Sequence, residues 1–146
     1  MEPLLLPDDD ATAALGRRLA GALKPGDLIL LHGELGAGKT ALARTIIRTL
    51  TGDDTLDVPS PSFALVQPYE GNGHRILHTD LYRIRDPREV GELGLFDRPD
   101  AIVLCEWPER GGDGFTSQAT GEVSLWIPPS GIGRLAGMQF ADGRQF

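Results

Sequence analysis

The stretch Gly33–Thr40, which reads G-E-L-G-A-G-K-T, decides the fold of this chain of 146 residues. It fits the pattern G-x-x-x-x-G-K-[S/T], in which glycines let backbone N–H groups turn inward around phosphate oxygens. The apolar run Asp27–Leu31 precedes it and predicts a buried parallel strand. The amphipathic segment Thr40–Leu50 follows it and predicts a helix whose positive end faces the same phosphates. Strand, glycine-rich loop and helix in this order predict a phosphate-binding loop.

The loop assigns roles to particular side chains. Lys39 is expected to reach the β- and γ-phosphates of a nucleotide and so to take part in catalysis, and the Thr40 hydroxyl is expected to bind Mg²⁺. The other loop positions would contact the nucleotide mainly through their backbone. The predicted nucleotide-binding residues of this region are Gly33, Glu34, Leu35, Gly36, Ala37, Gly38, Lys39, Thr40 and Ala41.

Two acidic residues close apolar segments further along the chain. Asp80 follows the segment 75–79, and Glu106 follows the segment 102–105. Ligands of open α/β sheets bind beyond the carboxyl ends of strands, and Mg²⁺ prefers oxygen ligands. We therefore expect both carboxylates to lie beside the loop, with ATP and Mg²⁺ as the cofactors. His78 shares a strand face with Asp80 and either orients the site or packs in the core.

The other segments complete an α/β pattern. The expected helices are 11–23, which Asp10 would cap, 40–50, and 87–93, which Asp86 would cap. The expected strands are 27–31, 63–69, 75–82, 101–105, 122–127 and 135–140. Asn72-Gly73 predicts a β-hairpin turn, and residues 111–114 predict a flexible turn. We expect one P-loop NTPase-like domain over residues 1–146, with a mixed, mostly parallel central sheet flanked by helices and a β-hairpin.

Composition excludes several classes of protein. The net charge of −7 disfavours autonomous nucleic-acid binding, which normally needs a basic face. No stretch approaches the roughly 18 apolar residues of a membrane span, and the N-terminus lacks the basic region of a signal peptide. The lone Cys105 lies in an apolar run and is expected to be a buried packing residue. We expect a cytoplasmic protein without membrane contact.

An ordered set of motifs resembles the bacterial YjeE family, also called TsaE. The motifs are Thr12 followed by Leu15-Gly16, the loop Gly33–Thr40, Ser60–Phe63, His78–Arg83, and Glu106-Trp107-Pro108. Together they span nearly the whole chain. Glu34 and Ser62 stand where the family usually has Asp and Thr, and Ala41 stands where it often has an extra Thr. These departures remove no charge and are compatible with activity.

The resemblance implies a Mg²⁺-dependent ATPase. Such a protein acts with TsaB and TsaD in making threonylcarbamoyladenosine at adenosine 37 of tRNA, with only indirect tRNA contact. It also implies that Thr40 and Glu106 hold Mg²⁺, that Asp80 acts near the γ-phosphate, and that Thr12 lies near the nucleotide. The segment 60–63 would be a switch loop. Arg83 and Trp107 could contact nucleotide or partner, although a core anchor is the commoner role of a tryptophan such as Trp107.

Three other classes remain open from the residues alone. A GTPase usually carries Asn-Lys-x-Asp, whereas the only asparagine here is Asn72 in the hairpin turn. A small-molecule kinase would need a lid, which Arg83, Arg85 and Arg88 could form. It would also need a binding site for the phosphate acceptor, and no sequence pattern indicates one. A non-catalytic, nucleotide-dependent assembly factor is compatible with the loop. Because no glutamine or arginine clearly completes the site, we expect weak hydrolysis by the chain alone and stimulation by partners.

Overall fold

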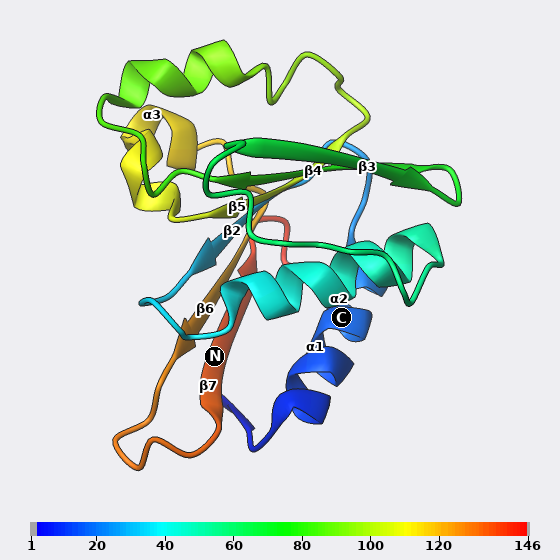
Figure 1. Ribbon diagram of the computed structural model, residues 1–146, viewed down its shortest axis with the longest axis vertical. Helices are drawn as coiled ribbons and strands as arrows, with labels where there is room; N and C mark the ends of the chain where they lie inside the picture. The colour runs from blue at the N-terminus through cyan, green and yellow to red at the C-terminus, as the bar shows by residue number, and fades with distance from the viewer. Residues whose placement is uncertain (1–2, 146) are drawn as a thin grey trace.

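A seven-stranded mixed sheet forms the centre of the structure, a computed structural model that describes residues 3–145 (Figure 1). The strands are β1 Leu4–Leu6, β2 Leu28–His32, β3 Val66–Gly71, β4 His74–Asp80, β5 Ile102–Glu106, β6 Gly121–Trp126 and β7 Arg134–Phe140. The α-helices are α1 Asp9–Ala22, α2 Lys39–Thr51 and α3 Asp113–Thr116, and the 3₁₀ helices are η1 Pro87–Leu93 and η2 Pro108–Gly111.

The sheet has a parallel centre and antiparallel edges. Its strand order is β1-β7-β6-β2-β5-β4-β3. The neighbours β6, β2, β5 and β4 run parallel, whereas β3 and β7 run antiparallel to the strands beside them. β1 pairs antiparallel with β7 and so shares the direction of the central strands. The predicted mixed, mostly parallel α/β sheet is confirmed, and its central strands end together at one edge.

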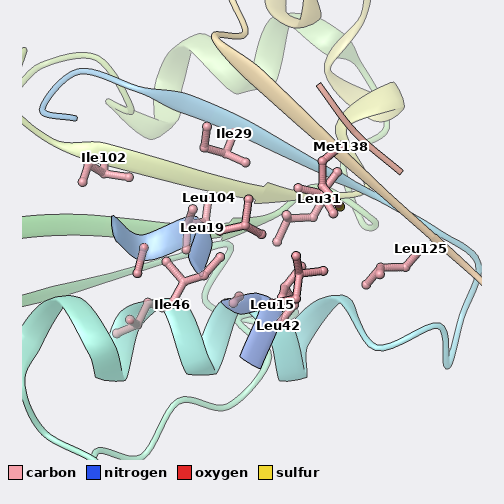
Figure 2. Close-up of a cluster of buried hydrophobic side chains, with 14 of the residues drawn as sticks. Leu15, Leu19, Ile29, Leu31, Leu42, Ile46, Ile102, Leu104, Leu125 and Met138 are labelled. Carbon is pink, nitrogen blue, oxygen red and sulfur yellow. The ribbon is translucent and has the colours of Figure 1, made fainter. Parts of the chain in front are cut away.

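Two apolar cores cover the two faces of the sheet. The larger core packs α1 and α2 against one face, with Leu15 and Leu19 from α1 meeting Leu42 and Ile46 from α2 (Figure 2). The smaller core lies on the other face beneath η1 and α3 and includes Phe115. The central strands are therefore buried on both sides, which explains their near-continuous apolar sequences.

Several local predictions agree with the structure. The hairpin turn places Asn72 at φ 51° and Gly73 at φ 77°, the left-handed conformation that a tight turn between twisted strands requires. The Asp86 side chain caps η1, and the Glu89 side chain reaches back to complete a capping box. The helix after the loop ends at Gly52, whose φ is 70°. Within the described range, 3–145, no helix is both long and apolar enough to cross a membrane.

Other predictions were wrong in detail. Asp8, not Asp10, caps α1, with its carboxylate accepting from the Ala11 N–H at 2.9 Å. The first hairpin strand begins at Val66 rather than residue 63, because the chain turns at Leu65, whose φ is 66°. The segment 87–93 is a 3₁₀ helix. Residues 111–114 are not a flexible turn, because Gly111 ends η2, Gly112 links the two helices, and Asp113 begins α3.

Candidate functional site

The glycine-rich loop joins the carboxyl end of β2 to the start of α2. Gly38 caps α2 at φ 104°, a conformation that a residue with a side chain would adopt only under strain. Gly33 lies so near β6 that an added Cβ would fall 2.7 Å from the Leu125 carbonyl oxygen. The N-terminal end of α2 therefore opens directly onto the loop, where its unpaired N–H groups favour an anion.

Lys39 is the first residue of α2, and its side chain contacts the start of the loop. Its side chain is buried, and its ammonium donates to the carbonyl oxygens of Gly33 and Glu34. The same ammonium lies 3.6 Å from the ring centroid of Trp107. Burial lowers the pKa of Lys39, while the nearby carboxylates, Glu106 foremost, oppose that shift. The loop thus concentrates positive charge where phosphate oxygens are expected.

The pairing of β4 with β5 brings the two predicted carboxylates to the same place. Asp80 and Glu106 are direct register partners at the ends of these parallel strands. Glu106 is buried and accepts from the Thr40 hydroxyl at 2.9 and 3.0 Å. The expectation that both strand ends lie beside the loop agrees with this arrangement.

Asp80 is held by backbone and side-chain donors. One carboxylate oxygen accepts from the Tyr82 N–H at 2.8 Å and the other from the Ser60 hydroxyl at 3.2 Å. Burial raises the pKa of Asp80 and the Glu106 carboxylate adds to the shift, whereas the bonds from Tyr82 and Ser60 oppose it. The carboxyl group therefore gains basicity without losing a fixed orientation, which suits a group that orients water.

A cavity of about 430 Å³ collects these groups. Its lining residues are Leu35, Gly36, Ala37, Gly38, Lys39, Thr40, Ala41, Ser60, Ser62, Asp80, Tyr82, Glu106 and Trp107. Of the predicted residues, Gly33 and Glu34 do not line the cavity, but their carbonyl oxygens accept from the ammonium of Lys39, which does. Thr12 lies apart on α1, where its hydroxyl donates to the Asp8 carbonyl oxygen at 3.5 Å, and its nucleotide contact stays a prediction.

One contact to the loop was not predicted from the sequence, and the role of His78 was left undecided. The guanidinium of Arg134, on β7, donates to the Gly36 carbonyl oxygen at 3.0 Å, a contact without any local sequence signal. His78 is completely buried, and its Nε2 atom lies 2.6 Å from a carboxylate oxygen of Glu106. Of the two interpretations of His78, the structure therefore supports contact with the site.

The donor set fits a hard divalent cation. Within residues 3–145, no cluster of three or more His, Cys, Asp and Glu side chains could hold a metal by itself. The Thr40 hydroxyl and the Glu106 carboxylate are nevertheless adjacent oxygen donors at the N-terminus of α2. Mg²⁺ is typically bound by one or two protein oxygens, with phosphate and water oxygens completing the octahedron. These two residues suit that pattern.

A glycine-rich loop between a central parallel strand and a helix, with carboxylates at the neighbouring strand ends, defines a P-loop nucleotide-binding protein. Within that class the chain has a family: the model of "Threonylcarbamoyl adenosine biosynthesis protein TsaE" matches residues 6–127. The chain belongs to the TsaE family. Its predicted resemblance to this family is confirmed.

Individual relatives agree with this assignment. The tRNA threonylcarbamoyladenosine biosynthesis protein TsaE of Rickettsia felis is 42% identical over 107 residues, which cover 73% of this chain and 62% of the relative. The protein of the same name from Haemophilus influenzae is 35% identical over 113 residues, covering 73% of this chain and 70% of the relative. The aligned stretch thus spans less than two thirds of the Rickettsia felis protein.

A solved structure agrees on the fold. The crystal structure of Bacillus subtilis YdiB superposes with a TM-score of 0.72 and covers 97% of this chain and 86% of its own. Sequence identity between the two is 20%, so this likeness concerns the architecture alone.

Proposed function

We propose that this chain is a Mg²⁺-dependent ATPase that acts in forming threonylcarbamoyladenosine at adenosine 37 of tRNA. The observation that carries the proposal is the convergence of Lys39, Thr40, Asp80 and Glu106 on one cavity at the N-terminus of α2. The names of the relatives supply the pathway. That work would take place in the cytoplasm, together with TsaB-like and TsaD-like proteins and with tRNA contacted only indirectly.

Each group would have a separate task. The loop N–H groups and the Lys39 ammonium would bind the phosphates, while Thr40 and Glu106 would hold Mg²⁺. An ion held there would neutralise phosphate charge. Asp80 would either orient the attacking water or help to hold the ion through a water molecule. Because phosphoryl transfer depends mainly on positioning and charge, this small set suffices for slow hydrolysis.

The alternatives account for fewer of the observed contacts. A small-molecule kinase would use Arg88 as a lid residue, but its guanidinium is exposed and paired with Asp86 at 2.6 Å. A GTPase would need a guanine-reading motif that the sequence lacks. A non-catalytic assembly factor would not need Asp80 to be buried and fixed by Ser60 and Tyr82. Hydrolysis coupled to assembly explains both the loop and the carboxylates.

The segment 60–63 is the proposed link between nucleotide and partner. The Ser60 hydroxyl contacts both Asp80 and, at 2.8 Å, the Ser62 hydroxyl. Phe63 follows with 87% of its surface exposed and an arginine, Arg83, stacked 4.7 Å from its ring. Loss of the γ-phosphate would therefore alter the position of the exposed Phe63 through the hydroxyl groups of Ser60 and Ser62. Other nucleotide-binding proteins likewise order a switch segment through the γ-phosphate.

Steady-state ATP turnover tests this function. We expect slow turnover by the isolated chain and stimulation when TsaB and TsaD are added together at fixed salt. A partner arginine can raise the rate roughly 10³–10⁵-fold in related chemistry, which sets the scale of the expected increase. GTP in the same assay should be a poorer substrate. Formation of threonylcarbamoyladenosine in tRNA, measured in parallel, reports on the pathway.

Two outcomes would contradict the proposal. The first is full-rate hydrolysis by the isolated chain that the partners leave unchanged. The second is formation of the modified nucleoside at the same rate without this chain. A preparation of the Asp80→Asn variant, purified identically, corrects for contaminating ATPases.

The metal ligands give a separate prediction. Replacing Glu106 by glutamine keeps the shape of the side chain but removes its charge, so the affinity for Mg²⁺ in the ADP complex should fall at least about tenfold. Binding of ADP in excess EDTA should change little, because the loop N–H groups and Lys39 remain. Titration of Mg²⁺ at fixed ADP measures the difference. Equal Mg²⁺ affinity in both proteins would remove Glu106 from the metal site.

A further inference from the structure

His78 is a buried polar side chain to which the proposed hydrolysis assigns no role. It has no exposed surface, and it lies on β4 two residues before Asp80. Along the same face of the sheet, Ile76 precedes it and belongs to the apolar core shared with α1 and α2. A histidine therefore occupies a buried position at the boundary between the apolar core and the site.

Among the described residues, the ring of His78 makes one hydrogen bond. Its Nε2 atom lies 2.6 Å from Glu106 Oε2, whereas Nδ1 is buried without a hydrogen-bond partner in the described part of the chain. An ionised carboxylate only accepts hydrogen bonds, so Nε2 carries the hydrogen. The geometry therefore assigns a hydrogen to Nε2, which donates to Glu106.

The two donors to Glu106 differ in kind. The Thr40 hydroxyl contacts both carboxylate oxygens, at 2.9 and 3.0 Å, and can rotate. The His78 ring contacts Oε2 from within the core and is fixed on all sides by packing. His78 therefore restricts the rotation of the carboxylate plane through Oε2, whereas Oε1 is contacted by Thr40.

We propose that His78 is a positioning residue that holds the Glu106 carboxylate in the orientation required to bind a divalent cation beside the nucleotide. This inference rests on the proposed function, since it concerns the same metal site. Outer hydrogen bonds of this type typically change metal affinity about 10–100-fold when removed. The imidazole would act only through Glu106 and would touch neither nucleotide nor metal.

Three substitutions separate positioning from packing. His78→Leu removes the donor but keeps an apolar group. His78→Gln places an amide N–H near the position of Nε2, whereas the shorter side chain in His78→Asn places one near Nδ1, away from Glu106. His32 offers a control outside the cavity lining, because its Nε2 lies 3.0 Å from another glutamate, Glu122, in a partly exposed pair.

The measurement is Mn²⁺ binding to the protein–ADP complex by electron paramagnetic resonance, together with ADP binding in EDTA and urea unfolding for each variant. We expect His78→Leu and His78→Asn to bind Mn²⁺ about 10–100-fold more weakly. His78→Gln and His32→Leu should stay near the parent protein. ADP affinity in EDTA should not change. If His78→Leu does not fold, the Gln and Asn variants decide the question.

The Mn²⁺ measurements distinguish failure of the proposed function from failure of the positioning role of His78. If the parent protein itself binds no Mn²⁺ with ADP, the proposed function is wrong and this inference falls with it. If the parent binds Mn²⁺ and the folded Leu or Asn variants bind it equally well, His78 does not position Glu106. Equal weakening in the Gln variant, or parallel weakening of metal-free ADP binding, would show a packing role and overturn the inference.

Discussion

Replacing Lys39 by alanine is expected to weaken ATP binding roughly 10- to 100-fold, the range of a lost charge-assisted contact. The ammonium is the only cation in the lining of the loop cavity within the described residues. It also braces the loop by donating to the carbonyl oxygens of Gly33 and Glu34, so the variant loses loop order as well as charge. Turnover should fall further than affinity, because the lysine also neutralises charge that develops during transfer.

The chain contains its own matched control for this change. Lys24 is the only other lysine, and it is exposed beyond the end of α1. Lys24→Ala alters the net charge equally but should leave ATP affinity at the parent value. Isothermal titration of both variants with Mg²⁺-ATP measures the contrast. Similar losses in the two variants would mean that net charge, rather than the loop contact, governs binding.

The loop and its flanking elements were predictable because their signals are local. The expected strand 27–31 is observed as β2 at Leu28–His32, and the expected helix 40–50 as α2 at Lys39–Thr51. An apolar run, three glycines and an amphipathic repeat suffice to define such a unit. The placement of Asp80 and Glu106 followed from one general property, since the ends of parallel strands share an edge.

The predictions of secondary structure failed where contacts between distant residues, or a choice between nearly equivalent residues, determine the structure. The strand β1 has only three residues, and its pairing with β7 joins segments from opposite ends of the chain. Three consecutive aspartates, Asp8 to Asp10, could each cap α1, and sequence pattern alone does not select Asp8. The 3₁₀ helix η1 has the capping box expected of an α-helix, but it has only seven residues and Gly91 lies within it.

The contacts inside the site required the strand register. His78 meets Glu106 only because β4 and β5 align Asp80 with Glu106, and no pattern in either strand fixes that alignment. Arg134 reaches Gly36 across a sequence separation of 98 residues. Residue type and spacing therefore indicated which groups carry the chemistry, whereas tertiary packing decided which neighbours orient them.

Replacing Asp80 by asparagine is expected to lower ATP turnover about 10²–10⁴-fold, the usual contribution of a positioned acid–base group. The free energy of unfolding of this variant should not fall, although its ATP turnover does. Burial raises the pKa of Asp80 in the folded chain above its value in the unfolded chain, so the ionised group opposes folding at neutral pH. The amide keeps the acceptor for the Tyr82 N–H and can donate to the Ser60 hydroxyl in place of the second oxygen.

Urea unfolding of the parent and Asp80→Asn proteins across acidic to neutral pH checks the sign. The variant should be at least as stable as the parent at neutral pH, and its advantage should shrink as the pH falls through the raised pKa of Asp80. Asp27→Asn is the contrasting control, because Asp27 is equally buried but pairs with Arg144 at 2.6 Å, so this change should destabilise. An Asp80→Asn protein that loses both turnover and stability would show that Asp80 supports the fold rather than the reaction.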